Sequence, residues 1–415
     1  MTATLAPVSA LLLSVVFLLM GNGLQGTLLP VRAQLELFST ADIGILGSFY
    51  FLGFAGGCYF GPHLVRRVGH IRAFAAMVSL ASTASLVHVL ILEPMFWWPI
   101  RAITGFCFAV LYMVIESWLN EKSTNETRGL VFSIYTIINL IVLTIGQMML
   151  TLADPKAFPL FAVASILVSL AALPVALTKA PAPAPIASVK IRVRYLFNAS
   201  PVGFIGALVV GLANGSFWSL APVFAQTNSA VVGASGIAMF MSISVIAGAM
   251  GQWPFGRLSD KIDRRKVIVI ICVGAAVMGL GMAALGHRWE NAAYLFSFLF
   301  GVFAFPLYAI CAAHMNDSIE AGGFVEASGG LLLLYATGAV IGPVVASVMM
   351  GFIGPGGLYI FMAAAHIAMT AFTIYRIGRR ARRSDADREP FADSIRIAQT
   401  VAPIDPIPEA TDKDD

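Results

Sequence analysis

Charged residues are scarce in this chain. Of its 415 residues, 12% are Asp, Glu, Lys or Arg and 58% are hydrophobic. A typical soluble domain has about 25% charged residues, so a chain with so few cannot cover its surface with groups that water solvates. The composition therefore excludes a soluble protein and predicts one that lipid solvates. A net charge of +4 on such a chain provides no basic face of the kind that binds nucleic acid.

Residues of metal sites and of acid-base catalysis are also few. The chain has 4 cysteines and 6 histidines, and the cysteines lie inside apolar runs without the paired spacing of a metal site. A membrane enzyme would need Asp, Glu and His residues that converge on one place. The apolar runs hold one clear carboxylate, Glu116, and two scattered histidines. The sequence thus predicts no enzyme, no metal site and no cofactor.

Long apolar runs, in contrast, are abundant. A helix needs roughly 20 mostly apolar residues to cross a bilayer, and twelve runs reach that length. The first run has no basic residue before it and no cleavage motif after it, so we interpret it as a span and not as a signal peptide. The runs lie near residues 8–30, 43–64, 73–92, 97–118, 129–151, 157–178, 201–224, 234–256, 266–286, 291–312, 326–351 and 356–376.

The basic residues are distributed unevenly between the two sides of these spans. Most of the 26 Lys and Arg residues fall in alternate connections and after the last run. The connections of the other side hold only Arg32, Lys156 and Arg288. Because cytoplasmic loops carry the excess of Lys and Arg, the pattern places both termini in the cytoplasm. We expect a multi-pass protein of a bacterial inner membrane.

The chain also repeats itself. Residues 22–34 and 214–226 are identical at seven of thirteen aligned positions, among them Asn22 and Asn214. A second repeat aligns Gly105, Leu111, Tyr112 and Asn120 with Gly301, Leu307, Tyr308 and Asn316. Two similar halves of six spans are the plan of many secondary transporters. The predicted fold is therefore all-α, with twelve transmembrane helices in two pseudo-symmetric six-helix bundles.

Composition divides the chain into four segments. The predicted segments are an N-terminal bundle at 1–178, a cytoplasmic linker at 179–200, a C-terminal bundle at 201–378 and a cytoplasmic tail at 379–415. The linker starts with alternating Ala and Pro, which cannot continue a helix. The tail is polar, with too few large apolar residues to fold alone, and we expect it to be disordered.

The connection after the eighth run carries a motif. It reads G-R-L-S-D-K-I-D-R-R-K over residues 256–266. Here the sequence resembles the major facilitator superfamily, whose signature G-x3-D-R/K-x-G-R-R/K occurs in this loop and in the loop after the second span. The first-half loop, with Arg66, Arg67 and Gly69, lacks the aspartate. The resemblance implies that these loops latch one state of a transport cycle; the alternative, simple anchoring by basic residues, leaves Asp260 unexplained.

Two further motifs lie inside spans. The fourth run reads R-A-I-T-G-F-C-F-A over residues 101–109 and is similar to the R-x3-G-x3-A pattern of the family. Arg101 then needs a polar cavity or a partner, or else it reaches back to the membrane surface. The eleventh run contains G-A-V-I-G-P over residues 338–343, which resembles the Gly-Pro kink of the family's exporters. Those exporters carry the kink in their fifth span, where this chain lacks it, so the main argument for a drug/proton antiporter is removed.

Polar residues inside the spans are the candidates for a substrate site. In the family that the sequence resembles, spans 1 and 7 line a central cavity, which would place Asn22 and Gln25 opposite Asn214 and Trp218. Asparagines in spans can also serve as interhelical hydrogen-bonding groups, and this alternative stays open. The predicted cavity residues are Asn22, Gln25, Arg101, Tyr112, Asn139, Asn214, Trp218, Tyr308 and Tyr335.

A second group of residues is predicted to act in coupling or gating. Glu116 near the cytoplasmic end of the fourth run can pair with Arg128 as a gate, although a simple interfacial glutamate is the alternative. The predicted coupling and gating residues are Glu116, Arg128, Asp260, Lys261, Arg264, Arg265, Arg66, Arg67 and Gly69.

The sequence as a whole predicts a secondary transporter. We expect it to move a small polar or amphipathic solute, with anions among the candidates, across the inner membrane by alternating access between the two halves. Its partners would be the solute and the lipid bilayer, with protons as a candidate coupling ion, and we expect a monomer that binds no nucleic acid. A non-transporting sensor or scaffold with a carrier fold is the alternative.

Overall fold

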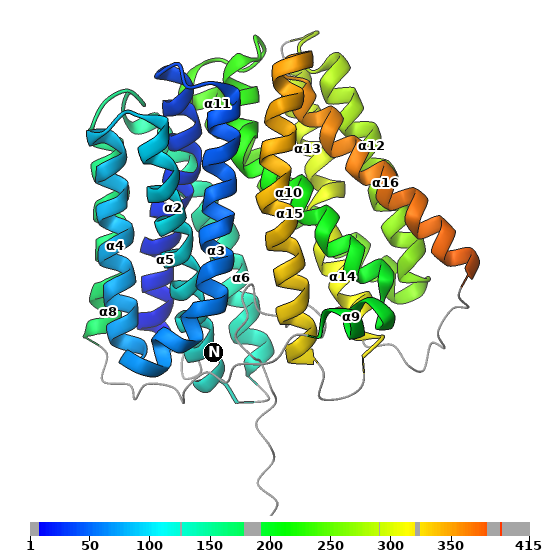
Figure 1. Cartoon of the computed structure of the whole chain (residues 1–415), viewed down its shortest axis with the longest axis horizontal. Helices are drawn as coiled ribbons and strands as arrows, with labels where there is room; N and C mark the ends of the chain where they lie inside the picture. Colours follow the sequence, from blue (N-terminus) through cyan, green and yellow to red (C-terminus); the bar gives the residue numbers. More distant parts are fainter. Residues whose placement is uncertain are drawn as a thin grey trace, which may run out of the picture.

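The computed structural model of the chain describes residues 8–124, 127–177, 192–289, 291–319, 324–379 and 391. Within these residues the fold is helical, without strands (Figure 1). Twelve helical segments are long and apolar enough to cross a membrane. The protein is thus an all-α integral membrane protein with the number of spans that the sequence predicts.

The first half comprises six spans. They are built from α2 (Ser9–Leu35), α3 (Thr40–Val68), α4 (His70–Leu90), α5 (Pro94–Glu121), α6 (Arg128–Met148) with η2 (Met149–Leu152), and α7 (Pro159–Leu170) with α8 (Ala172–Ala176). The sequence sets several of these boundaries locally. Ser39 begins α3 with a capping box, in which its hydroxyl accepts the Asp42 N–H and the Asp42 carboxylate accepts the Ser39 N–H. Proline occupies the first turns of α5 and α7, where no N–H is needed.

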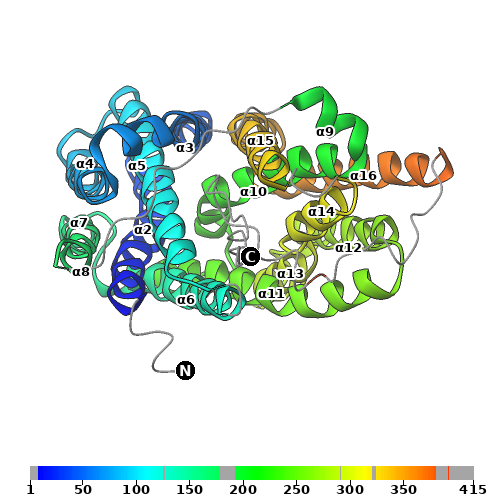
Figure 2. The same ribbon diagram turned by 90° about the horizontal axis from the view of Figure 1, so that it is seen from below.

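The second half repeats the arrangement. A short helix α9 (Val193–Ala199) precedes α10 (Pro201–Thr227), α11 (Gly233–Lys261), α12 (Arg264–Leu285), α13 (Ala292–Ala304), α14 (Leu307–Asn316), α15 (Phe324–Ile353) and α16 (Gly357–Arg379). The helices α2 and α10 both have 27 residues, and α3 and α11 both have 29. Seen from below in Figure 2, the two halves lie side by side, with α2, α3 and α6 facing α10, α11 and α15.

The tenth span differs from the predicted uninterrupted run. It is divided into α13 and α14 by a turn at Phe305 and Pro306, because proline has no N–H to continue the helical ladder. The predicted domain boundaries stay predictions. Residues 179–191 of the linker, and all of the tail except Arg379 and Phe391, lie outside the described residues, while α9 occupies the end of the linker.

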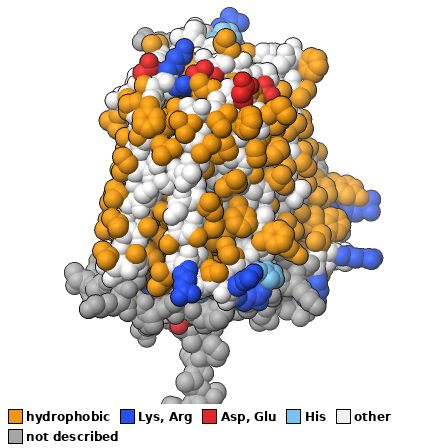
Figure 3. Space-filling view, turned by 60° about the vertical axis from the view of Figure 1, so that its left-hand side comes forward, with side chains coloured by type: hydrophobic (Ala, Val, Ile, Leu, Met, Phe, Trp, Pro, Cys, Tyr) orange, Lys and Arg blue, Asp and Glu red, His pale blue; other side chains and the backbone are white. Residues whose placement is uncertain are grey.

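Charge distinguishes the two ends of the bundle. We call the end at which α3 and α11 finish the basic side, since Arg66, Arg67 and Lys261 lie there. Between the charged ends the surface is a belt of hydrophobic side chains (Figure 3). Large apolar residues within it are exposed, such as Leu52, Ile141 and Ile246. Such a belt is what lipid solvates, and it would be unusual on a soluble monomer.

The hydrophobic core is shared between the halves on one side only. One cluster joins residues of both halves, among them Leu28, Leu46, Phe217 and Leu220, and these lie in the helix portions away from the basic side. Toward the basic side, the clusters are each made by a single half within the described residues. Among the described residues, the hydrophobic cores of the two bundles are therefore joined on the opposite side and separate on the basic side.

Small residues form the seam on the opposite side. A Cβ added at Gly47 of α3 would overlap the Ser219 side chain of α10, and one added at Gly44 would overlap Ser347 of α15. Glycine is therefore needed at both positions for the helices to approach this closely. The seam closes the space between the halves at that end.

Candidate functional site

A cavity of about 450 Å³ lies between the two halves. Its walls come from α2, α3, α5 and α6 of the first half and from α10, α11, α14 and α15 of the second. The polar and aromatic residues that line it are Asn22, Thr27, Tyr50, Phe51, Phe54, Arg101, Tyr112, Asn139, Gln147, Asn214, Trp218, Ser219, Tyr308 and Tyr335. Eight of the nine predicted cavity residues are therefore brought together, and Gln25 is the exception.

The repeat-related asparagines line the cavity from the two halves. Asn22 lies on α2 and Asn214 lies on α10. The Asn22 amide donates to the Tyr112 hydroxyl over 3.4 Å and also lies beside Tyr50. Asn22 thus forms a polar cluster with Tyr50 and Tyr112 on the wall made by the first half. The other donors and acceptors of its amide can bind a solute.

Arg101 contributes the positive charge of the cavity. It lies on α5, seven residues after Pro94, and only 8% of it is exposed. Its guanidinium carbon lies 4.3 Å from the centre of the Tyr50 ring, an arrangement that stabilises a cation through the ring's negative face. The Nη1 atom is buried and makes no hydrogen bond among the described residues. Arg101 therefore faces the cavity and does not extend to the membrane surface.

Three aromatic residues, Trp218, Tyr308 and Tyr335, line the cavity from the second half. The Trp218 ring is stacked on Phe305, with ring centres 5.8 Å apart. Tyr308 packs against Tyr335 at 5.6 Å, and Tyr335 meets Phe51 of the first half at 6.4 Å. Such contacts hold the rings in fixed orientations. This wall can accept the apolar body of a solute while offering phenolic hydroxyls at its edge.

Gln25 points away from the cavity. It is 1% exposed, and its amide donates to the Ser85 hydroxyl of α4 over 2.8 Å. Gln25 is only about 60° from Asn22 around α2, so the hydrogen bond to Ser85 marks it as turned toward α4 and away from the cavity. Gly26 lies on the cavity side instead.

Sequence reasoning missed Tyr50. It shares one face of α3 with Gly47, Phe51 and Phe54, and all four line the cavity. Their spacing of three and four residues is the signal of a helical face. That signal was available in the sequence, but an aromatic stripe of this kind is also typical of ordinary helix packing.

Glu116 is buried behind the cavity and does not line it. It lies one turn beyond Tyr112 on α5 and is 0% exposed. The Tyr135 hydroxyl of α6 donates to its carboxylate over 3.3 Å. The predicted pairing with Arg128 concerns a side chain outside the described residues. Glu116 is thus positioned between the cavity and the basic side.

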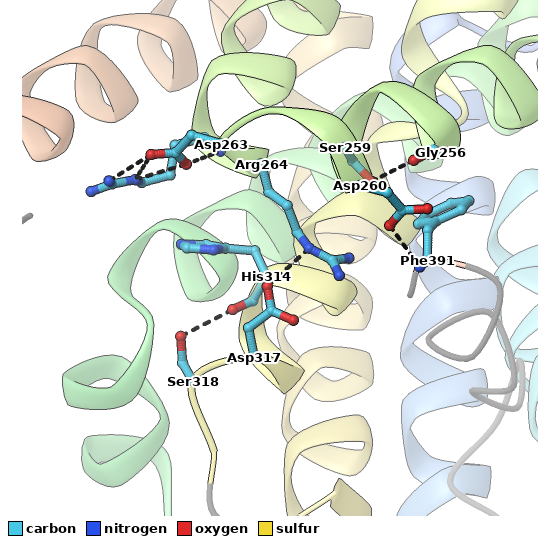
Figure 4. Close-up of polar contacts among 10 residues, drawn as sticks. Gly256, Ser259, Asp260, Asp263, Arg264, His314, Asp317, Ser318 and Phe391 are labelled. Carbon is cyan, nitrogen blue, oxygen red and sulfur yellow. Dashed lines mark hydrogen bonds and ion pairs between the residues drawn. The ribbon is translucent and has the colours of Figure 1, made fainter. Parts of the chain in front are cut away.

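The motif of residues 256–266 begins inside α11, and there it contacts a residue from the C-terminal tail (Figure 4). The backbone N–H of Phe391 donates to the Asp260 carboxylate over 2.8 Å, and a Cβ at Gly256 would overlap the Phe391 ring. Phe391 is 5% exposed and joins a cluster made by the second half. Nothing in the sequence predicts this contact, because the tail is polar around Phe391.

Two ion pairs follow in the same motif. Arg264 lies 2.9 Å from Asp317 at the end of α14, and both side chains are buried. Arg265 lies 2.7 Å from Asp263, which also accepts the Arg265 backbone N–H and so caps α12. Burial tends to raise the pKa of Asp263, but the hydrogen bonds and charge of Arg265 outweigh it and hold that pKa below its ordinary value. Lys261 is exposed.

The corresponding loop of the first half is simpler. Arg66 and Arg67 are exposed at the end of α3, and no ion pair of theirs occurs among the described residues. Gly69 has a φ of 85° and separates α3 from α4. Glycine adopts that left-handed region without strain, which explains the residue at this turn.

Comparisons with known sequences agree with this geometry. A family model described as Major Facilitator Superfamily matches residues 11–325 and 203–406. The chain is 26% identical over 382 residues to the uncharacterized MFS-type transporter YcaD of Salmonella typhi, covering 90% of this chain and 96% of that protein. It is also 26% identical over 362 residues to YcaD of Escherichia coli strain UMN026, covering 86% and 92%.

Comparisons with solved structures find the same fold. The nucleoside transporter NupG superposes with a TM-score of 0.74 at 14% identity, covering 90% of this chain and 99% of that one. A bacterial homolog of the human lysosomal transporter Spinster, in an inward-facing and occupied conformation, gives 0.70 at 16% identity, covering 92% and 98%. At such identities the likeness establishes the fold and not the substrate.

Proposed function

From the premise that the chain belongs to the major facilitator superfamily, and is a secondary transporter and not an enzyme, we propose that it moves a small polar or amphipathic solute by alternating access. The solute binds in the cavity between the halves, and rocking of the halves exposes that cavity to each side of the membrane in turn. The cavity is lined by both halves of one chain, which supports a monomer as the working unit.

The observation that carries this proposal is the position of the cavity. It lies between two bundles whose cores are joined on one side and separate on the other, and the repeat-related Asn22 and Asn214 both line it. A scaffold has no need for a solute-sized cavity, and a sensor can bind a solute without a seam of small residues that closes the cavity at one end. Alternating access does need such a seam, because it must open and close repeatedly.

The orientation follows from charge. Lys and Arg accumulate on the cytoplasmic face of bacterial membrane proteins, so the basic side, with Arg66, Arg67 and Lys261, faces the cytoplasm, and so do both termini. The structure then has its cavity closed toward the periplasm. Figure 1 places the beginning of α2 at this basic end.

Proton coupling is assigned to Glu116. This carboxylate is buried beside Tyr135 and lies one turn from Tyr112, which lines the cavity. A buried carboxylate is costly in a membrane and persists where it has a use or a partner. Protonation of Glu116 would neutralise its carboxylate during the change between the state open to one side of the membrane and the state open to the other.

The test is counterflow in proteoliposomes that contain the purified protein. Vesicles are loaded with an unlabelled candidate solute, and a transporter accumulates the labelled solute transiently without any ion gradient. Candidates come from a thermal-shift screen, because a ligand that binds the folded protein raises its apparent stability. Ligands that bind without any exchange, in vesicles of either orientation, would favour the sensor alternative.

A further inference from the structure

The charge balance of the cavity is uneven. Among the described residues that line it, Arg101 is the only one that carries a charge at neutral pH, and none is Asp or Glu. Arg101 takes part in none of the ion pairs found among the described residues, so it has no carboxylate partner there. The described lining thus carries one positive charge that no carboxylate of the described residues compensates.

The immediate surroundings of Arg101 supply little compensation. The Tyr50 ring covers one face of its guanidinium, and the Nη1 atom has no hydrogen-bond partner. His88 also lies near Arg101, but its Nδ1 lies 2.6 Å from the Ala84 carbonyl oxygen and a histidine supplies no negative charge. A buried charge without a partner costs several kcal/mol. A ligand that brings a negative charge would form an ion pair with Arg101 and would also remove this cost.

We propose that the substrate is an organic monoanion with an aromatic or similarly apolar body, bound through its carboxylate by Arg101. The inference rests on the proposed function, since it assigns the ligand class of the same cavity. A single negative charge matches the single cation, whereas a dianion would leave one charge without a cationic partner among the described lining residues. A guanidinium offers two parallel N–H groups that fit a carboxylate.

The walls define the rest of the ligand. Tyr50, Phe51 and Phe54 line the cavity from α3, and Trp218, Tyr308 and Tyr335 line it from the second half. Aromatic rings in such a setting favour a flat apolar body through edge and offset-stacked contacts. A volume of about 450 Å³ lies in the lower part of the range for small-molecule sites, which suits one or two rings with a short acidic chain.

Arg101 is placed near the closed end of the cavity. It lies seven residues from the start of α5, which corresponds to about 10 Å of helix. Asn22 and Asn214 each lie 13 residues from the end of their helices on that side, or about 20 Å. The carboxylate would therefore enter first and stop beneath the seam, with the apolar body at the level of the asparagines and tyrosines.

The experiment compares head groups on one body. Purified wild-type protein is titrated with 3-phenylpropionate, 3-phenylpropanamide and 3-phenylpropylamine, and with benzoate and indole-3-acetate beside their amides. Thermal shift and intrinsic tryptophan fluorescence report binding. We expect at least one carboxylate to bind at least tenfold more tightly than its amide, which is about 1.4 kcal/mol, and the amine not to bind.

Variants of Arg101 test whether this residue causes the preference for a carboxylate. Arg101→Gln should abolish the preference for carboxylate over amide, and Arg101→Lys should keep part of it because the charge remains. Arg379→Gln removes an exposed arginine at the end of α16 and should leave the preference unchanged. If Arg101→Gln does not fold, the head-group comparison on the wild type and on Arg101→Lys decides the question.

The outcomes separate this inference from the proposed function. Equal or better binding of amides or amines, or no binding of any carboxylate in the series, overturns the monoanion assignment. Counterflow of a neutral or cationic solute would overturn it as well, yet would leave the transporter intact. Tight carboxylate binding that depends on Arg101, without exchange of the bound compound, would support the ligand class and contradict transport.

Discussion

Gly47 offers a direct way to open the closed side. This residue of α3 faces α10 at the seam, and an added Cβ would overlap both the Cβ and the Oγ of Ser219. Rotation of the serine hydroxyl cannot relieve an overlap with Cβ, so the two helices must move apart. Gly47→Ala should therefore destabilise the packed seam and favour the state in which the opposite side is open.

The magnitude follows from the cost of overpacking. An extra methyl group in a well-packed contact typically costs about 1–3 kcal/mol. If that cost falls only on the state with the closed seam, the ratio of the two states changes by roughly 5- to 150-fold. In the proposed open state α10 would have moved away from α3, so we expect no comparable contact at Gly47.

Accessibility of a reporter cysteine measures this shift. Leu46 lines the cavity beside the seam and is 3% exposed, so Leu46→Cys is introduced into a chain whose native cysteines are replaced by alanine. A membrane-impermeant maleimide is added to spheroplasts, where it reaches only the periplasmic surface. Labelling should be slow with Gly47 present and should accelerate in the Gly47→Ala background.

Two controls make the result specific. Gly351 lies near the same end of the molecule on α15, and a Cβ there meets nothing within 4 Å, so Gly351→Ala should leave labelling unchanged. Ser219→Gly removes the overlapping atoms and should restore slow labelling to Gly47→Ala. Unchanged labelling in Gly47→Ala, or equal acceleration in Gly351→Ala, would refute the reasoning that the seam controls access.

Three further predictions concern single residues. Glu116→Gln should abolish pH-driven uptake but leave counterflow intact, and uptake that still follows the pH gradient would rule out Glu116 as the coupling group. The pKa of Asp263 is held below its ordinary value. The Asp263 carboxylate therefore stabilises the fold above that ordinary value, and this stabilisation is lost as the pH falls through the folded-state pKa. Melting temperatures measured between neutral and acid pH should fall less with acid in Asp263→Asn than in the wild type. Phe391→Ala should lower the melting temperature, because it removes a ring packed on Gly256, whereas Phe352→Ala, at an 85% exposed position, should not.

The fold could be predicted from the sequence because its signals are long and redundant. Each span is an apolar run of about the required length, and the repeat around Asn22 and Asn214 fixed the relation between the halves. Boundaries were set by local chemistry, such as proline in the first turn of α5 and α10. The turn at Pro306 was missed because the apolar run continues through it, and hydropathy does not register a lost N–H.

The candidate site was less accessible to sequence reasoning. The repeat identified Asn22 and Asn214. Which way a side chain points around a helix depends on the helices that pack against it, and hydropathy does not identify those helices. Gln25 was therefore assigned to the cavity wall, where Gly26 lies instead. Tyr50 gave only the weak signal of a helical stripe. The contact of Phe391 with Asp260 joins residues 131 positions apart, and no periodic pattern encodes such a pairing.

The division of the core has a consequence for how this chain can vary. Each hydrophobic cluster near the basic side is made by residues of a single half. A substitution in such a cluster therefore affects packing within one bundle only. The joint cluster on the opposite side includes Leu28 and Phe217 from different halves, and a change in either must suit the other. A chimera that combines one half with the complementary half of a distant homologue should therefore fail first at this shared surface, and compensating exchanges in its evolution should concentrate there.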